Sequence, residues 1–383
     1  MKRAGMLLLC FFLLAGLLPC RVNALELNVA AKSAVLMDAA TGTVLYEQNA
    51  HEPLAPASVT KVMTMLLIME AIDSGKISWD DMVTASEAAA AKGGSQIYLK
   101  VGETMTVSDM VKSIAVSSAN DCACAMAEHL VGSESAFVDL MNKKAQELGM
   151  ADTHFVNCTG LDDDTEAMKH RTSVYDIAIM SRELLKNHPD IKKFTTIWMD
   201  TVRNGAFGLS NTNKMVRFYN GCTGLKTGFT SGAGYCLSAS ALRDGMELIA
   251  TVMGSKTSAD RFAAAKGMLD YGFSNFALYE PAVQEGAAVP VTLGVSPFVT
   301  AVPAEDAQLL IEKGQTDSIV TEVELEPQVT APVVAGQHLG TLTIKSRDQI
   351  LKEIPLAAES DVNRLTWGDL TVKILRQLAM AKS

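Results

Sequence analysis

The stretch Pro53-Leu-Ala-Pro-Ala-Ser-Val-Thr-Lys-Val-Met-Thr64 joins a polar lead-in to the apolar run Val62-Met-Thr-Met-Leu-Leu-Ile-Met69. The run predicts a buried helix with Ser58 and Lys61 at its head. Residues three apart share one helical face, so the amine can reach the hydroxyl. Burial and the positive end of the helix both lower the pKa of such a lysine, and its neutral amine can activate a serine. A capping serine beside a surface lysine has the same spacing, so the pair alone leaves both interpretations open.

Two later motifs supply further polar groups. Ser118-Ala-Asn120 offers a hydroxyl that can relay a proton and an amide that can hold a substrate carbonyl. Lys226-Thr227-Gly228, on a predicted strand, offers a cation, a hydroxyl for a carboxylate and a glycine that admits a substrate backbone. A polar loop and an edge strand with a bulge are the structural alternatives for these two motifs.

Hydrophobic periodicity predicts an α+β domain over residues 25–277. Strands are predicted at 33–38, 43–47, 224–229, 235–242 and 247–252, and helices after Ser58 and at 106–130, 135–148, 173–186 and 258–271. The region between the two groups of strands is predicted to be helical. Asp244-Gly245 joins the last two strands as a hairpin.

The composition changes near Pro281. Residues 278–360 alternate with period two and contain no obvious catalytic group, which predicts a small all-β domain. Residues 361–383 predict an amphipathic helix with Trp367 on its apolar face. This helix can lie on a membrane surface or pack against its own domain, and the sequence supports both equally.

Residues 1–24 predict a secretory signal peptide. A positive start precedes the apolar segment Met6–Leu18, and Val22-Asn-Ala24 suits cleavage. An uncleaved N-terminal anchor is the alternative, and a lipid anchor on Cys20 is disfavoured by Pro19. The mature chain is therefore expected outside the cytoplasm, at the outer face of the cytoplasmic membrane, in the cell wall or in the periplasm.

Composition argues against nucleic-acid binding, and the cysteines and histidines do not indicate a metal site. A net charge of -10, a pI near 5.2 and 6% aromatic residues argue against nucleic-acid binding. The five cysteines after the signal lack metal-ligand spacing, although a bridge between Cys222 and Cys236 is possible. His154 and His170 are interpreted as structural or exposed, and no metal or cofactor is expected.

The three motifs in this order resemble those of penicillin-binding proteins and serine β-lactamases. The flanking segments, such as "APASVTKVMT", "SSANDCACAMAEHLVGS" and "GLKTGFTSGAGYCLSASA", resemble D-alanyl-D-alanine carboxypeptidases of the peptidase S11 type. The resemblance covers nearly all of the mature chain. It implies a β-lactamase/DD-peptidase-like domain, with an antiparallel sheet flanked by helices and a helical subdomain, followed by a small all-β domain.

The resemblance also implies roles for the motif residues, with a peptidoglycan stem peptide as substrate and β-lactams as covalent inhibitors. Ser58 would form the acyl-enzyme and Lys61 would be its base. Ser118 with Lys226 would transfer protons, Asn120 would position the peptide, and Thr227 would bind the carboxylate. Gly228 would allow the substrate backbone to approach closely. The backbone N–H groups of Ser58 and Phe229 would bind the oxyanion.

Some residues depart from the family's motifs, and two other functions remain as alternatives. Relatives with Asn-Arg-Asn use the arginine near the substrate carboxylate, whereas this chain has Asn211-Thr-Asn-Lys214, so Lys214 and Arg217 are candidate cations. Phe229 replaces a histidine found in some relatives. A serine β-lactamase would need a glutamate in a Glu-x-x-x-Asn loop, and the segment containing Glu166 lacks that pattern. A non-catalytic penicillin sensor or peptidoglycan-binding protein is the other rival, although all the reactive side chains are present.

Overall fold

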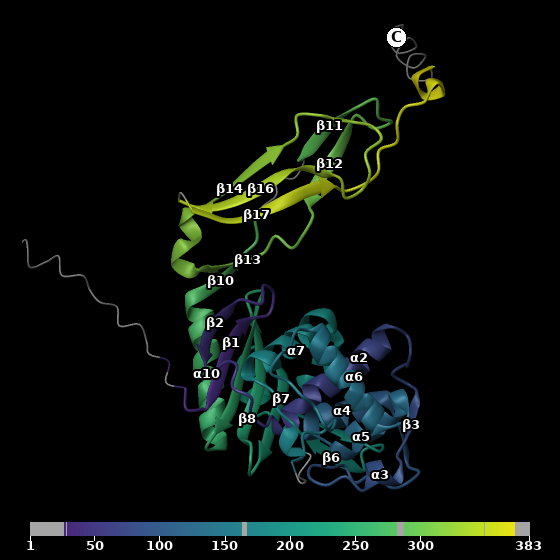
Figure 1. Ribbon diagram of the computed structural model, residues 1–383, viewed down its shortest axis with the longest axis vertical. Helices are drawn as coiled ribbons and strands as arrows, with labels where there is room; N and C mark the ends of the chain where they lie inside the picture. Colours follow the sequence, from purple (N-terminus) through teal and green to yellow (C-terminus); the bar gives the residue numbers. More distant parts are fainter. Residues whose placement is uncertain (1–26, 28, 163–166, 282–286, 348, 372–383) are drawn as a thin grey trace, which may run out of the picture.

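The computed structural model describes residues 27, 29–162, 167–281, 287–347 and 349–371. Figure 1 shows two parts: a larger part that mixes helices with a central sheet, and a smaller part built from strands beyond one end of helix α10 (Ser258–Asn275). The predicted α+β domain followed by an all-β domain is confirmed. The predicted signal peptide, the segment around Glu166 and residues 372–383 lie outside the described residues.

A five-stranded antiparallel sheet forms the centre of the larger part, in the order β2-β1-β9-β8-β7. Its strands are β1 (Ser33–Asp38), β2 (Val44–Gln48), β7 (Cys222–Thr230), β8 (Gly234–Arg243) and β9 (Met246–Ser255). The five strands predicted for this domain coincide with them. β7 pairs within the sheet with β8 alone, so the strand that carries Lys226-Thr-Gly228 is an edge strand.

Helices cover both faces of this sheet. On one face α10 packs against β8 and β9 around an apolar core that includes Leu248 and Leu269. On the other face α7 (Val174–Asn187) contacts β1 and β9, and α2 (Lys61–Asp73) packs behind α7. Every α2 residue from Lys61 to Met69 is buried, as expected of a helix that is apolar all round. The quoted stretch therefore leads into the core.

Further helices and 3-10 turns complete the larger part among the described residues. They are η1 (Ala57–Thr60), α3 (Glu87–Ala90), α4 (Val107–Ser117), α5 (Asn120–Val131), α6 (Glu134–Glu147), η2 (Ala167–Lys169), η3 (Pro189–Ile191), α8 (Lys192–Thr195) and α9 (Met215–Phe218). Side chains of Thr106, Ser133, Ser173 and Thr257 each accept a hydrogen bond from the backbone N–H three residues on. These N-caps fix where α4, α6, α7 and α10 begin.

Three details differ from the predicted elements. Ser58 lies in the 3-10 turn η1, and α2 begins only at Lys61. The predicted helix 106–130 is broken because Ser118 adopts a left-handed φ of 62°. The middle region also contains two small sheets, β3 (Met82–Thr84) with β4 (Thr104–Thr106) and β5 (Met199–Val202) with β6 (Phe207–Ser210). Strands of three or four residues are too short for a period-two pattern to reveal them.

The smaller part is a β domain with its own apolar core. Its elements are β10 (Phe276–Tyr279), β11 (Ala288–Thr292), β12 (Phe298–Pro303), β13 (Leu309–Glu312), η4 (Lys313–Ser318), β14 (Ile319–Leu325), β15 (Val329–Thr330), β16 (His338–Ser346) and β17 (Gln349–Ala358). Six strands form one sheet, β14-β16-β17-β12-β11-β15, and β10 pairs with β13. Residues along β14 alternate between half-buried and exposed, as the period-two pattern predicts. The limits 278–360 stay a prediction.

The five described cysteines are free. Cys222 lies opposite Ala241 and Cys236 opposite Gly228, so these two thiols do not form the bridge considered from the sequence. Within the described ranges, no helix has the length and apolar character needed to cross a membrane. Trp367 is 88% exposed, and a membrane-binding terminal helix remains a prediction.

Candidate active site

Ser58 and Lys61 meet where η1 runs into α2. Lys61 Nζ lies 2.9 Å from Ser58 Oγ. Residues three apart are eclipsed in a 3-10 turn, so η1 brings the two side chains into line. Ser58 is partly exposed, whereas Lys61 is fully buried. The hydroxyl can therefore meet a substrate while the amine behind it is shielded from water.

The environment of Lys61 favours its neutral form. Burial lowers the pKa of Lys61 from 10.5 to about 7. The amine donates a hydrogen bond to the carbonyl of Thr159 at 2.9 Å. A neutral amine has one lone pair, and the Thr159 bond leaves that lone pair free to face Ser58. Near pH 7 a substantial fraction of Lys61 can thus accept the serine proton.

The second motif occupies the junction between α4 and α5, two helices that pack against α2. Ser118 ends α4 and is 3% exposed, while Asn120 is the first residue of α5. Asn120 Nδ2 donates to the carbonyl of Gly93 at 2.7 Å. Its Oδ1 is buried and has no hydrogen-bond partner among the described residues. The side chain therefore has one unused acceptor.

Asn120 and Asp121 also fix the loop that contains Gly94, Ile97 and Leu99. A Cβ on Gly94 would lie 2.8 Å from Asn120 Nδ2 and 3.2 Å from Leu161, so the loop backbone passes closely between these two side chains. The buried carboxylate of Asp121 accepts the N–H groups of Ile97 at 3.1 Å and Leu99 at 3.0 Å. The second motif is thus held rigidly.

The third motif brings β7 against η1. A Cβ on Gly228 would lie 2.7 Å from the Pro56 carbonyl and 3.1 Å from the Ser58 nitrogen, so a side chain here would push the strand away. Lys226 is buried, and burial together with the charges of Lys61 and Arg261 lowers its pKa. The interaction with Lys61 means that the structure brings the first and third motifs together.

Two groups position the motif strand from the sides. Arg261 Nη1 donates to the carbonyls of Gly228 at 2.9 Å and Cys236 at 3.2 Å, which ties α10 to β7 and β8. Thr227 Oγ1 donates to Thr212 Oγ1 at 2.7 Å. Neither Arg261 nor Thr212 was selected from the sequence, and no sequence pattern indicates that Arg261 pairs with β7.

The segment that carries Thr212 is anchored by its flanking asparagines. Asn211 Nδ2 donates to the carbonyl of Ile197 at 2.7 Å, and Asn213 Nδ2 donates to that of Gly224 at 3.0 Å. Asparagine on both sides of a threonine is the signal that could have identified the hydroxyl between them. The anchors present Thr212 to β7.

The candidate cations and Phe229 occupy the surface near this segment. Arg217 stacks over the rings of Trp198 and Phe218, with its guanidinium carbon 5.8 and 5.7 Å from their centroids. Lys214 precedes α9 as its N-cap residue. Phe229 is 53% exposed and its ring centroid lies 4.3 Å from that of Tyr235. The identity of the cation that assists Thr227 stays a prediction.

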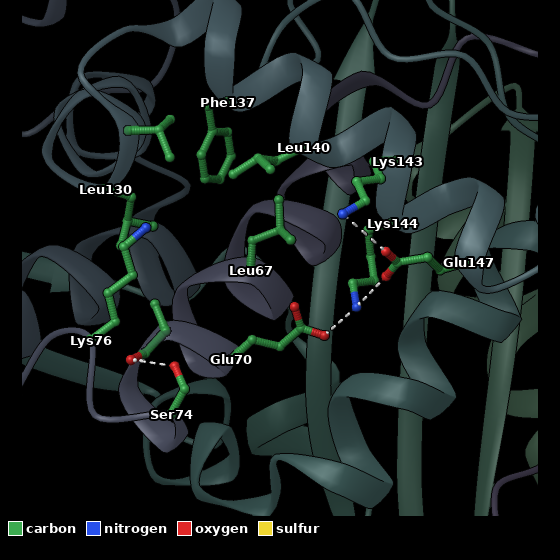
Figure 2. A pocket seen from close by; sticks show the side chains of 12 residues that line it. Leu67, Glu70, Ser74, Lys76, Leu130, Phe137, Leu140, Lys143, Lys144 and Glu147 are labelled. Carbon is green, nitrogen blue, oxygen red and sulfur yellow. Dashed lines mark hydrogen bonds and ion pairs between the residues drawn. The ribbon is translucent and has the colours of Figure 1, made fainter.

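Figure 2 shows a separate cavity at the other end of α2. Glu70 of α2 and Lys144 and Glu147 of α6 lie on its rim. Lys144 Nζ is 2.8 Å from Glu70 and 2.9 Å from Glu147, and Lys143 Nζ is 3.7 Å from Glu147, so each carboxylate has a lysine partner. This cavity contains none of the motif residues, and we assign it no role in the chemistry.

One group among the described residues has ligand atoms close enough for a metal ion. Single atoms of Glu70, Glu183 and His188 lie within 4.8 Å of one another. Glu70 already pairs with Lys144, and the His188 ring bonds to Asp73. Glu183 accepts a hydrogen bond from Asn187 at 2.8 Å, so each member of the group has a partner within the chain.

Residues 21–257 match the family model described as D-alanyl-D-alanine carboxypeptidase, peptidase S11, which covers more than half of the chain. The chain belongs to this family. Residues 276–364 match the model of the penicillin-binding protein 5 C-terminal domain. Both parts of the D-alanyl-D-alanine carboxypeptidase architecture are therefore present, in the order predicted.

Two individual relatives cover most of the chain, and a third covers about two thirds of it. The D-alanyl-D-alanine carboxypeptidase DacF of Bacillus subtilis is 45% identical over 361 residues, covering 90% of this chain and 91% of the relative. The structure of penicillin binding protein 5 from Haemophilus influenzae is 31% identical with a TM-score of 0.75, covering 88% and 98%. Penicillin-Binding Protein D2 from Listeria monocytogenes, solved in an ampicillin-bound form, is 32% identical with a TM-score of 0.57, covering 65% and 99%.

Proposed function

We propose that this chain is a serine-type D-Ala-D-Ala carboxypeptidase that removes the terminal D-Ala from peptidoglycan stem pentapeptides. The observation that carries the proposal is the buried amine of Lys61, with its pKa lowered to about 7, at 2.9 Å from the partly exposed hydroxyl of Ser58 and beside a strand edge. Family membership supports the same reaction, and the ampicillin-bound relative supports acylation by β-lactams.

Acylation begins with the serine. Ser58 Oγ attacks the carbonyl carbon between the two D-alanines while its proton passes to Lys61 Nζ. The carbonyl oxygen takes up negative charge, which the backbone N–H groups of Ser58 and Phe229 stabilise. The C–N bond then breaks and the leaving D-Ala amine receives a proton through Ser118 and Lys226. Water hydrolyses the resulting ester, which regenerates Ser58 and releases the shortened peptide.

The stem peptide is proposed to lie along β7. An edge strand offers unpaired backbone groups, and an extended peptide can add to it as a further strand. Gly228 lets β7 pack closely against η1, which places this edge beside Ser58. Asn120 would bind an N–H group of the peptide and not the substrate carbonyl expected from the sequence, because its nitrogen is bonded to Gly93 and its oxygen is unpaired.

Thr227 and Thr212 together suit the terminal carboxylate of the substrate. Replacing Thr212 with valine should raise KM about 3- to 10-fold with little change in kcat, because one hydrogen bond to the bound ground state is lost. Steady-state kinetics of D-Ala release measure both constants. Thr201→Val, at an exposed position, is the control. An unchanged KM would exclude contact between Thr212 and the carboxylate.

Incubation with a muropeptide pentapeptide tests the proposed function. Mass spectrometry should detect a tetrapeptide and one equivalent of free D-Ala, and penicillin should leave a lasting adduct on the protein. Rapid penicillin turnover without an adduct would favour the β-lactamase alternative. No D-Ala release from a folded protein would favour the non-catalytic sensor. A cross-linked dimer as main product would assign transpeptidation instead.

Export is part of the proposal. The substrate lies outside the cytoplasm, and residues 1–24 have the features of a secretory signal. The mature protein is proposed at the outer face of the cytoplasmic membrane, in the cell wall or in the periplasm, with residues 361–383 on the membrane surface. Cell fractionation tests this: a protein that retains residues 1–24 in the cytoplasmic fraction would contradict it.

A further inference from the structure

A buried hydrogen-bond relay lies behind the nucleophile turn. His170 is 2% exposed, and its Nδ1 accepts the backbone N–H of Val156 at 3.2 Å. Burial lowers the pKa of His170 to about 3, so the ring is neutral and its other nitrogen, Nε2, carries the proton. Nε2 lies 2.8 Å from Thr60 Oγ1, which in turn donates to the carbonyl of Ala57 at 2.8 Å. Each donor and acceptor in this relay has one defined role.

The last acceptor of the relay belongs to the peptide group that precedes the nucleophile. A peptide bond is planar and trans, so the Ala57 carbonyl and the Ser58 N–H point in opposite directions within one rigid unit. Fixing the carbonyl therefore fixes the direction of the N–H. A bond to the carbonyl oxygen also polarises the peptide and strengthens its N–H as a donor.

This peptide group needs external support. Ala57 has a φ of 48°, a left-handed conformation that a residue with a Cβ rarely adopts and that is strained. A Cβ on Gly160 would lie 1.8 Å from the Ala57 oxygen, so the backbone of Gly160 packs directly against the same carbonyl. The carbonyl is thus held between the Thr60 hydroxyl and Gly160.

The same loop also holds the base. Thr159 precedes Gly160 and accepts the hydrogen bond from Lys61. Since Gly228 approaches the Ser58 nitrogen from β7, the peptide group is enclosed by the relay, the Gly160 backbone and the motif strand. Its orientation is determined by buried neighbours on each of these sides.

We propose that His170 and Thr60 are positioning residues that aim the Ser58 N–H at the carbonyl oxygen of the substrate. The inference rests on the proposed function, in which this N–H stabilises the oxyanion. Neither side chain touches the substrate, because both lie behind the turn. Their contribution grows as negative charge develops, so it acts on the transition state and on kcat more than on KM.

Thr60→Val tests the relay, because valine keeps the shape of threonine and removes its hydroxyl. We expect kcat for D-Ala release to fall about 10- to 100-fold, less than the 10²–10³ lost with a whole oxyanion donor. KM should change less than about 3-fold. Thr60→Ser retains the hydroxyl and should restore kcat to within about 3-fold of the original value.

Thr64→Val is a matched control. Thr64 is fully buried on α2, and its hydroxyl donates to the carbonyl of Cys158 at 2.7 Å. Both valine variants therefore lose one buried hydroxyl and leave one carbonyl without its donor, and Thr60→Val also leaves the Nε2–H of His170 without its acceptor. Only Thr60→Val should lower kcat of the folded protein strongly. Equal kcat values in the two variants would overturn the proposal.

The pH profile distinguishes misdirection of the N–H from damage to the base. In Thr60→Val the plateau of kcat/KM should fall while the inflection assigned to Lys61 stays in place. A displaced inflection would mean that Lys61 had moved and would contradict the proposal.

If Thr60→Val fails to fold, His170→Gln, whose amide can donate, should keep more activity than His170→Leu. Equal activities of these two folded variants would overturn the relay. Failure of the proposed function would give a different result, because the unmodified protein would then release no D-Ala.

Discussion

Ser58→Ala should abolish both the release of D-Ala from a stem pentapeptide and the covalent labelling of the protein by penicillin. Among the residues that the structure describes, Ser58 combines partial exposure with a lysine amine of lowered pKa at 2.9 Å and a glycine-bearing strand edge beside it. Without the nucleophile no acyl-enzyme can form, and we expect kcat to fall on the order of 10⁴- to 10⁶-fold. Intact-mass measurement after incubation with penicillin checks the loss of the adduct directly.

Two serine controls make this result specific. Ser118→Ala should slow acylation but still give the adduct, since Ser118 is assigned to proton transfer and not to attack. Ser360→Ala, at an exposed position in the β domain, should behave as the unmodified protein. A penicillin adduct that persists in Ser58→Ala would show that another residue is the nucleophile, and peptide mapping of that adduct would identify it.

The fold was predictable where the sequence repeats a simple pattern over enough residues. The predicted strands 235–242 and 247–252 lie within β8 and β9, since Asp244-Gly245 marks the turn between them. α2 was predictable because its run of buried residues is continuous. Helix N-caps and the alternation along β14 report equally local preferences. Such signals depend on neighbours in the chain, so they can be recognised without the tertiary structure.

The motif residues of the site were predictable, but their supports were not. Lys61 bonds to a carbonyl 98 residues away, and Thr227 pairs with a hydroxyl 15 residues away. The spacing of residues along the chain does not predict such contacts. His170 was interpreted only as structural or exposed; it is buried, and its link to the nucleophile turn spans 110 residues.

Backbone strain was equally hidden from the sequence. Ala57 and Ser118 both have left-handed backbones, at positions where a pattern of side chains predicts ordinary helix or loop. Residues of this kind stay strained only because surrounding packing holds them. Recognising them requires the packing itself, which is why the 3-10 turn at Ser58 and the left-handed backbone of Ser118 were not anticipated.

Lys61→Met should remove most of the activity and also change how stability depends on pH. Loss of a general base costs about 10²- to 10⁴-fold in rate. The folded pKa of about 7 lies below the unfolded value of 10.5, so between these values the unfolded chain binds a proton that the folded chain does not. The free energy of unfolding of the unmodified protein therefore rises with pH across this window, by up to about 1.4 kcal/mol per unit from this group alone.

Methionine has a similar length to lysine and no charge, so in Lys61→Met this residue no longer makes the free energy of unfolding depend on pH. The stability of Lys61→Met relative to the unmodified protein should accordingly be greatest at or below pH 7 and decrease towards pH 10.5. The lost bond to Thr159 weakens the variant at each pH and cancels when two pH values are compared. Denaturant unfolding at pH 7 and pH 9.5 measures the difference, and Lys143→Met, whose side chain is 71% exposed, is the control. A difference that is independent of pH would show that Lys61 is not held neutral by the fold, which would remove the physical basis for its role as base.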